Sequence, residues 1–372
     1  MLMLVPGRGM FLPKLCERSP EAAAYIFNLV GKINGVNLEK NTGSVFIPAD
    51  PRLLELLASW GKGFLCADEQ VRAWYRSEIR AEAMRARLIL AESHPLSHPR
   101  ATDLFPFQTV GASFIAQNQR VLLADDCGLG KTVQIVVGVE ENGPPEDVLV
   151  LCPNSVKYWW QTEQRGWTAF PNSPAVVFES KTRRTQQQEF GGGWAIVNYE
   201  QFRSDEWYWK RHWKWLIIDE AHNLKNRKTQ LFDKIKRTSF EGIILATGTP
   251  MGNDPSELWA LLHLLYPEKY TSYWRFYELY VDYTEDFWGS RHVTGARNPK
   301  LLRRDLASRM IQRRREAVLH ELPERTEQEI PLVMLPKQEA YYRSVVLKML
   351  LTLDDGTELR VRNTMSKIMR LR

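Results

Sequence analysis

The chain contains an apolar run that ends in a glycine-rich turn and continues directly into a helical pattern. Residues 122–125 predict a buried strand, Gly128 and Gly130 predict a tight turn, and Lys131 begins a predicted helix. Glycine allows consecutive backbone N–H groups to face inward, and the helix adds the positive end of its dipole. The pattern is typical of a phosphate-binding loop. The alternative is an ordinary glycine turn between a strand and a helix.

Two side chains at the start of this helix suit a nucleoside triphosphate held with magnesium. Lys131 can reach the β and γ phosphates, and Thr132 can offer its hydroxyl to Mg²⁺. The common form of the motif has glycine five residues before Gly130, whereas this chain has Asp125 there. The loop alone therefore predicts the site less strongly than the full motif would.

A second apolar run, residues 215–218, ends in the adjacent carboxylates of Asp219 and Glu220. A strand that is apolar on both faces is typical of a parallel sheet, whose ligands bind at the carboxyl edge. We expect Asp219 to hold Mg²⁺ through water and Glu220 to orient and deprotonate the attacking water. The alternative is a strand that runs into a solvated acidic turn.

Apolar runs and helical segments alternate from residue 103 onward, which predicts an α/β fold with a parallel sheet. The predicted strands are 121–125, 148–152, 175–179, 194–198, 215–219 and 243–247, and the predicted helices between them are 107–118, 131–140, 155–165 and 225–237. Polar residues follow several strands at the same edge. The last such cluster, residues 247–250, consists of small residues. Through Gly248 and Thr249 it can contact both the water beside the phosphates and a neighbouring groove.

Composition limits the class of protein. The 372 residues suffice for two or three domains, and 50 basic against 44 acidic side chains give a net charge of +6, which is compatible with a polyanionic partner. The four cysteines have no paired spacing, so neither a disulfide framework nor a zinc site is predicted. No stretch approaches the roughly 18 apolar residues of a membrane span, so we expect a soluble protein that binds no membrane.

The order of the motifs resembles the first motor lobe of helicase superfamily two, in particular the Swi/Snf-type translocases of double-stranded DNA. The segments that carry the resemblance are Leu104–Gly111, Asp125–Thr132, Leu151–Trp159, Asn198–Phe202, Asp219–Asn226 and Thr247–Pro250. The Lys225–Asn226 pair after the acidic box is the most specific of these features. Residues 280–301 resemble the annealing-helicase branch of that family. The resemblance covers residues 100 to 372.

The resemblance implies a RecA-like parallel sheet with flanking helices, preceded by a small α+β N-terminal domain, and it assigns roles to individual residues. The residues implied in ATP binding are Gln108, Asp126, Gly128, Leu129, Gly130, Lys131, Thr132 and His222. The residues implied in catalysis are Lys131, Asp219 and Glu220, and the residues implied in Mg²⁺ binding are Thr132 and Asp219. The residues implied in DNA binding are Asn154, Ser155, Lys157, Asn198, Tyr199, Lys225, Asn226, Gly248 and Thr249.

The same resemblance predicts four parts of the chain. Residues 1–65 are expected to form the accessory domain, residues 66–100 a helix and a linker, and residues 101–335 the first RecA-like ATPase lobe with a helical insertion. Residues 336–372 are expected to form a bridge toward a second lobe. We expect the second lobe to lie beyond residue 372 or on a partner chain. Apart from such a partner, we expect the protein to be a monomer. The expected location is the nucleus in a eukaryote and the cytoplasm, near the nucleoid, for a bacterial or viral source.

Four groups of residues allow more than one interpretation. A predicted hairpin, 36–39 with 44–47, fits a nucleic-acid module or a packing appendage, and the helix predicted at 68–92 fits a solvated surface or a DNA surface. The arginine-rich run 300–315 fits a structural role, a contact between lobes or a DNA contact. The tryptophans at 207–215 fit a core or a base-stacking surface.

Three functions are compatible with these motifs. The first is a motor lobe of a DNA-dependent ATPase that translocates on, anneals or remodels duplex or forked DNA. The second is an ATP-binding scaffold without motor activity of its own, and the third is an unrelated phosphate-loop enzyme such as a small-molecule kinase. Glu220 favours the first over a scaffold, since a binder needs no water-activating carboxylate. Gln108 together with Lys225 and Asn226 argues against a kinase.

In the family that the chain resembles, the second lobe supplies arginine fingers. Loss of an arginine finger costs on the order of 10³ to 10⁵ in rate. We therefore expect this polypeptide by itself to bind ATP and to hydrolyse it slowly.

Overall fold

The computed structural model describes two compact units, Met1–His320 and Glu321–Arg372. The described residues are 3–5, 9–12, 37–39, 44–47, 69–252, 254–286, 289–307, 309–319, 333–348, 350–352 and 358–360. The four-part division expected from the sequence stays a prediction. Within the segment expected to form a bridge, residues 349, 353–357 and 361–372 lie outside the described residues.

A seven-stranded parallel sheet forms the centre of the first unit, with strand order β13-β5-β10-β9-β6-β8-β7. Its strands are β5 (Arg120–Leu123), β6 (Asp147–Cys152), β7 (Ala175–Val177), β8 (Gly193–Asn198), β9 (His212–Asp219), β10 (Ser239–Ala246) and β13 (Met310–Ile311). Six of the seven were predicted from apolar runs, so the expected RecA-like α/β fold is confirmed.

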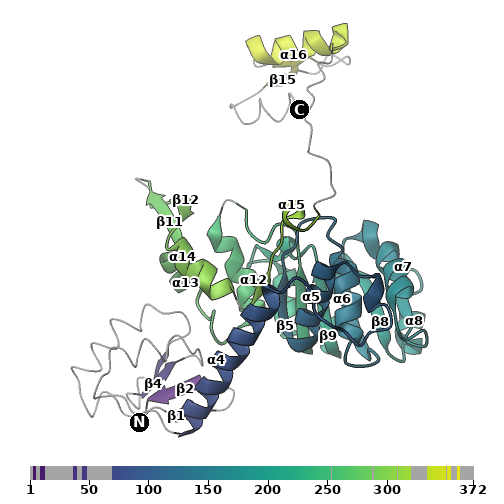
Figure 1. The fold of residues 1–372 in the computed structure, drawn as a ribbon. Helices are drawn as coiled ribbons and strands as arrows, with labels where there is room; N and C mark the ends of the chain where they lie inside the picture. The colour runs from purple at the N-terminus through teal and green to yellow at the C-terminus, as the bar shows by residue number, and fades with distance from the viewer. Residues whose placement is uncertain are drawn as a thin grey trace, which may run out of the picture. The chain divides into compact units, whose positions relative to one another are not determined.

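Successive residues of each central strand face opposite sides of the sheet, and both sides are buried. Leu122 and Ile218 belong to one core cluster, whereas Leu123 and Ile217 belong to the other. The helices α5 (Pro106–Gln117), α6 (Lys131–Glu140) and α7 (Lys157–Trp167) lie along one side (Figure 1). The helices α9 (Tyr199–Ser204), α10 (Glu206–Lys210), α11 (Gln230–Arg237) and α12 (Leu258–Leu265) cover the other. This burial explains why the strands are continuous apolar runs.

The N-terminal segment forms a separate antiparallel sheet with strand order β1-β2-β4-β3. Its strands are β1 (Met3–Val5), β2 (Gly9–Leu12), β3 (Asn37–Glu39) and β4 (Ser44–Ile47). The last two pair as the predicted hairpin, with Leu38 opposite Val45. The helix α4 (Glu69–Ile89) follows it. Most of its arginines are exposed, while Leu88 is buried in the core of the lobe.

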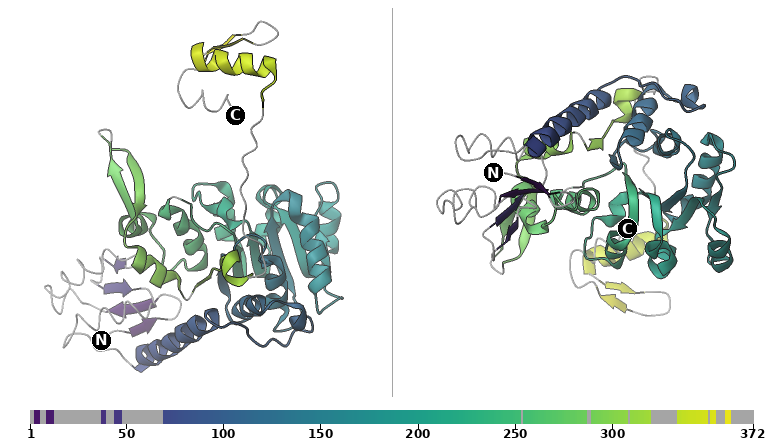
Figure 2. Two further views of the ribbon diagram at one scale, coloured as in Figure 1. Left: turned by 45° about the horizontal axis from the view of Figure 1, so that its top comes forward. Right: turned by 90° about the horizontal axis from the view of Figure 1, so that it is seen from below.

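A helical insertion separates β10 from β13. It contains α12, α13 (Tyr273–Tyr280), the hairpin of β11 (Val281–Glu285) with β12 (Arg291–Ala296), and α14 (Pro299–Leu306). The hairpin projects from the lobe (Figure 2). The short helices α8 (Arg183–Glu189) and α15 (Arg315–Val318) complete the described part of this unit.

Asp305 of α14 is a buried ionic anchor of the insertion. Its carboxylate accepts hydrogen bonds from the ammonium of Lys269 and the hydroxyl of Tyr270, and its Oδ1 lies 3.5 Å from Nη1 of Arg309. Burial alone would raise the pKa of Asp305, but the charges of Lys269 and Arg309 and the hydrogen bonds outweigh burial and lower it to about 2. The ionised carboxylate therefore stabilises the folded state.

We expect Asp305→Asn to lower the free energy of unfolding by about 2 kcal/mol at pH 7. Because the pKa is lower in the folded state than the unfolded value of about 3.9, this contribution is present above about pH 4 and is lost as the pH falls toward about 2. Urea denaturation at several pH values measures the difference between the two chains. Asp103→Asn, in the exposed pair with Arg100, is the matched control. A difference that stays constant down to pH 2 would contradict the assignment.

The second unit contains α16 (Pro336–Lys348) and a hairpin of β14 (Leu350–Thr352) with β15 (Glu358–Arg360). Among the helices in the described parts of the chain, none combines the length and the apolar character needed to cross a membrane.

Candidate active site

The strand register brings the phosphate-loop motif and the acidic pair to one edge of the sheet. Ala246 of β10 pairs with Leu123 of β5 on one side and with Asp219 of β9 on the other. Because β10 lies between them, β5 and β9 are about 10 Å apart in the sheet. The residues that follow these two strands can therefore share one nucleotide. The charge of Lys131 also acts on the Asp219 carboxylate, where it lowers the pKa that burial raises.

The turn after β5 has the backbone geometry of a phosphate loop. Gly128 and Gly130 have φ values of +87° and +68°, in the left-handed region that favours glycine. The ammonium of Lys131 donates to the carbonyl oxygens of Asp125 at 2.8 Å and Asp126 at 3.2 Å. The lysine therefore lies over the loop, where a phosphate would replace these carbonyl contacts.

Gln108, which the family resemblance assigns to the adenine, is buried against this turn. Its Nε2 donates to the carbonyl oxygen of Leu129 at 3.3 Å, and its Oε1 accepts from the backbone N–H of Phe105 at 3.0 Å. A Cβ atom at Gly130 would come within 2.4 Å of Nε2. The glycine is thus required both by its φ angle and by the close approach of Gln108. The adenine contact stays a prediction.

Asp125, at the position where the common motif has glycine, binds Arg313. The carboxylate is fully buried, and it accepts from Nε of Arg313 at 3.0 Å and from Nη2 at 2.5 Å. It also accepts from the backbone N–H of Arg313 at 3.0 Å and from Nε2 of Gln134 at 3.2 Å. Arg313 follows β13, the two-residue strand beside β5. The pair therefore joins the end of the lobe to the phosphate loop.

Asp219 is held at the end of β9 by two donors. Its Oδ2 accepts from the indole N–H of Trp160 at 2.8 Å, and its Oδ1 accepts from the backbone N–H of Glu220 at 3.0 Å. Burial, helped by the charge of Glu220, raises the pKa of Asp219, while Trp160 and Lys131 oppose the shift. The carboxylate is therefore held in one orientation.

Glu220 has a left-handed backbone, with φ of +52°, which is unfavourable for a residue with a Cβ atom. Its side chain is 36% exposed, and its Oε2 lies 3.0 Å from Nδ1 of His222. The same Nδ1 lies 3.3 Å from Oγ1 of Thr247, at the end of β10. The carboxylate thus faces solvent at the edge of the sheet, where an attacking water would stand.

The donor set fits magnesium. Mg²⁺ prefers oxygen ligands and is commonly bound by one or two carboxylates together with substrate phosphates and water. Asp219 provides such a carboxylate, and Thr132, the second residue of α6, provides a hydroxyl. These two residues would hold the ion, which would neutralise charge on the phosphates.

Most of the residues assigned to DNA by the resemblance also lie at this edge. Asn154 and Ser155 are exposed in the 3₁₀ turn Asn154–Val156 after β6, Asn198 is the last residue of the neighbouring strand β8, and Tyr199 follows it. Nδ2 of Asn198 donates to Oδ1 of Asn154 at 2.9 Å, so the two segments touch. Asn226 and Thr249 are exposed after β9 and β10, and Gly248 is half-buried beside Thr249.

Two of the assigned lysines have protein partners instead. The ammonium of Lys157 is buried and donates to the carbonyl oxygen of Phe178 at 3.2 Å. The ammonium of Lys225 lies 2.8 Å from Oε2 of Glu257, which also accepts from the backbone N–H of Gly252 at 2.9 Å. These contacts favour structural roles for both lysines, and their predicted DNA contacts stay predictions.

Tertiary packing also bears on two of the groups for which the sequence allows more than one interpretation, the tryptophans at 207–215 and the arginine-rich run 300–315. Trp213 is fully buried, and Trp207 packs against the same core. The guanidinium of Arg211 lies 5.3 Å from the ring centroid of each. Within the arginine-rich run, Arg309 and Arg313 bind Asp305 and Asp125 respectively. Both observations favour the structural interpretations.

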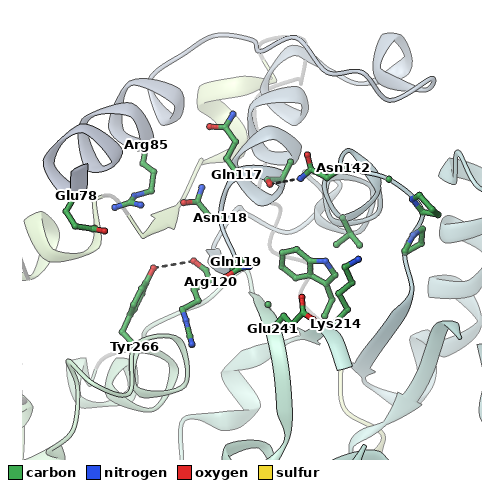
Figure 3. A pocket seen from close by; sticks show the side chains of 17 residues that line it. Glu78, Arg85, Gln117, Asn118, Gln119, Arg120, Asn142, Lys214, Glu241 and Tyr266 are labelled. Carbon is green, nitrogen blue, oxygen red and sulfur yellow. Dashed lines mark hydrogen bonds between the residues drawn. The ribbon is translucent and has the colours of Figure 1, made fainter. Parts of the chain in front are cut away.

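A cavity of about 720 Å³ lies at the opposite edge of the sheet (Figure 3). Arg120, Lys214 and Glu241, near the beginnings of β5, β9 and β10, line it together with Glu78 and Arg85 of α4. Because phosphate-loop and acidic residues follow the carboxyl ends of these strands, this cavity is not part of the candidate site.

The chain is similar to known proteins over most of its length. The family model described as "SNF2-related domain" matches residues 39–372. The chain is 27% identical over 265 residues to the human "SWI/SNF-related matrix-associated actin-dependent regulator of chromatin subfamily A member 1", covering 68% of this chain and 24% of that protein. It is 34% identical over 178 residues to "ATP-dependent DNA helicase DDM1" of Arabidopsis thaliana, covering 44% and 23% respectively.

The chain therefore spans about a quarter of the length of these curated relatives. Among solved structures, it is similar to the "Sulfolobus solfataricus SWI2/SNF2 ATPase core in complex with dsDNA", at 23% identity and a TM-score of 0.49. That match covers 76% of this chain and 59% of the other.

Proposed function

Because the chain belongs to the SNF2-related domain family, we propose that it is the ATP-binding motor lobe of a DNA-dependent ATPase that translocates on, anneals or remodels duplex or forked DNA. The observation that carries the proposal is the meeting of the phosphate loop and the acidic pair at one sheet edge, beside an exposed row of polar residues.

In this proposal, the nucleotide binds across the turn that follows β5. Lys131 leaves the loop carbonyls for the β and γ phosphates, and the loop N–H groups and the beginning of α6 hold the remaining phosphate oxygens. Asp219 and Thr132 hold Mg²⁺, and Gln108 hydrogen-bonds the adenine. Glu220 accepts a proton from the attacking water, while His222 hydrogen-bonds Glu220 and orients it.

Duplex DNA is proposed to lie along the polar residues at the ends of β6, β8, β9 and β10, where Asn154, Asn226 and Thr249 are exposed. The polar side chains there are suited to phosphate contacts, which fix the position of a protein on DNA without reading its sequence. We further propose the four-part division of the chain, with residues 336–372 leading toward a second RecA-like lobe in cis or in trans. We propose a nuclear location for a eukaryotic source, in line with relatives named as regulators of chromatin.

The polypeptide of these 372 residues is proposed to bind ATP and to hydrolyse it slowly by itself, because an arginine finger from a second lobe contributes about 10³- to 10⁵-fold. The second candidate function, an ATP-binding scaffold, is disfavoured by the partly exposed Glu220 carboxylate, which nucleotide binding does not need.

Binding of labelled duplex, forked and single-stranded DNA, with and without MgATP, tests the proposal. We expect duplex or forked DNA to bind and the affinity to change with MgATP. Asn154→Asp should weaken binding roughly tenfold, because it places negative charge beside the phosphates. Asn172→Asp is the matched control, since Asn172 is exposed before β7 at the opposite edge. ATP binding without DNA binding would overturn the motor proposal and favour the scaffold.

A further inference from the structure

Two buried or half-buried aromatic side chains connect the exposed polar edge to the acidic pair. We propose that Trp160 and Tyr199 are positioning residues, which couple DNA contact at Asn154 and Asn198 to the geometry of Asp219 and Glu220. The inference rests on the proposed function, because it concerns the same edge. It assigns a role to the buried Trp160 and adds a second role, through its hydroxyl, to Tyr199, which the resemblance assigns to DNA.

The first connection runs through α7. Asn154 and Ser155 are exposed in the turn that leads into this helix, and Trp160 lies one helical turn inside it. Trp160 is 1% exposed, so its indole N–H has to be satisfied within the protein. That N–H donates to Oδ2 of Asp219 at 2.8 Å. A shift of the start of α7 would therefore move the donor that orients the carboxylate.

The second connection runs through α9. Asn198 precedes this helix and donates to Asn154, and Tyr199 is its first residue. The hydroxyl of Tyr199 donates to the backbone carbonyl of Asp219, and it lies 3.4 Å from the carbonyl oxygen of Glu220. The tyrosine thus contacts the carbonyls on both sides of the left-handed Glu220 backbone.

These contacts link both exposed segments to the same two residues. The carbonyl of Glu220 also accepts from Nδ2 of Asn223 at 3.0 Å, so three side chains define the backbone and carboxylate at this position. A left-handed conformation costs about 1–2 kcal/mol for a residue with a Cβ atom. It therefore depends on such contacts, and changes in the edge segments can alter it.

The alternative explanation is that Trp160 is only a core residue. Trp160→Phe separates the two explanations, because it keeps most of the ring and removes the N–H donor. Partners of a metal-binding carboxylate typically contribute 10- to 100-fold to metal affinity. We expect Trp160→Phe to weaken Mn²⁺ binding in the presence of ATP by about tenfold or more, measured by electron paramagnetic resonance with Mn²⁺ replacing Mg²⁺.

Trp167→Phe, at the other end of α7, is the matched control, and its Mn²⁺ affinity should equal that of the unchanged chain. An unchanged Mn²⁺ affinity in Trp160→Phe would overturn the role of Trp160.

The coupling itself is measured as the ratio of MgATP dissociation constants with and without duplex DNA. We expect this ratio to be about fivefold or more in the unchanged chain, and to approach one in Trp160→Phe and Tyr199→Phe. DNA affinity without nucleotide should stay within about twofold of that of the unchanged chain in Trp160→Phe. If duplex DNA and MgATP bind and the ratio is unchanged in both variants, the inference is overturned and the proposed function stands. If duplex DNA does not bind the unchanged chain, the proposed function itself fails.

Discussion

Glu220→Gln is expected to abolish most ATP hydrolysis and to leave ATP binding intact. Glutamine keeps the shape of the side chain but cannot accept the proton of the attacking water, and removal of a general base typically costs about 10²- to 10⁴-fold in rate. Single-turnover hydrolysis, with the protein in excess over radiolabelled ATP and with duplex DNA present, detects even slow chemistry. Equilibrium binding of a fluorescent ATP analogue measures the affinity.

Lys131→Ala provides the contrasting variant. Hydrogen bonds to charged groups contribute about 1.5–3 kcal/mol, so loss of the lysine should weaken ATP binding roughly 10- to 100-fold. Opposite outcomes for Lys131 and Glu220 would separate binding from chemistry at one site. A Glu220→Gln chain that hydrolyses ATP at the unchanged rate would exclude Glu220 as the base.

Arg313→Met is expected to lower the free energy of unfolding by about 3–5 kcal/mol. The substitution leaves the fully buried Asp125 carboxylate without its main partner, and breaking a buried ion pair on one side has a cost of that size. Urea denaturation followed by circular dichroism measures the loss. Arg314→Met, at the adjacent exposed position, should stay within about 0.5 kcal/mol of the unchanged chain.

A double-mutant cycle tests whether the effect belongs to the pair. Asp125→Leu should destabilise the chain as Arg313→Met does, since it leaves a buried guanidinium unpaired. The double variant should cost less than the sum of the two single variants, because no charge is then left alone. Simple additivity would mean that the two side chains stabilise the fold independently.

Much of the fold could be predicted from local sequence patterns. Buried parallel strands are apolar on both faces, so six strands could be predicted from runs of adjacent apolar residues. The seventh, β13, has only two residues and therefore no periodicity to detect. The helices α8, α9 and α10 are five to seven residues long and were not predicted for the same reason.

Long-range pairing limited the prediction of the site. The sequence places Asp125 at a position where glycine is usual, yet its partner Arg313 is 188 residues away. The family resemblance assigns Lys157 to DNA, and the sequence does not indicate that its ammonium donates to the buried carbonyl of Phe178. Trp160 lies on the buried face of α7 with Lys157 and Gln164, and nothing local indicates that its N–H faces Asp219.

The sequence alone determined six of the seven sheet strands, the phosphate-loop turn and the acidic pair, because strand hydrophobicity, glycine geometry and adjacent carboxylates are properties of neighbouring residues. Only the tertiary structure decided which polar side chains are exposed at the site and which are buried partners of it. The physical reason is that burial and ion pairing depend on the order of the strands in the sheet, which brings together residues far apart in the chain.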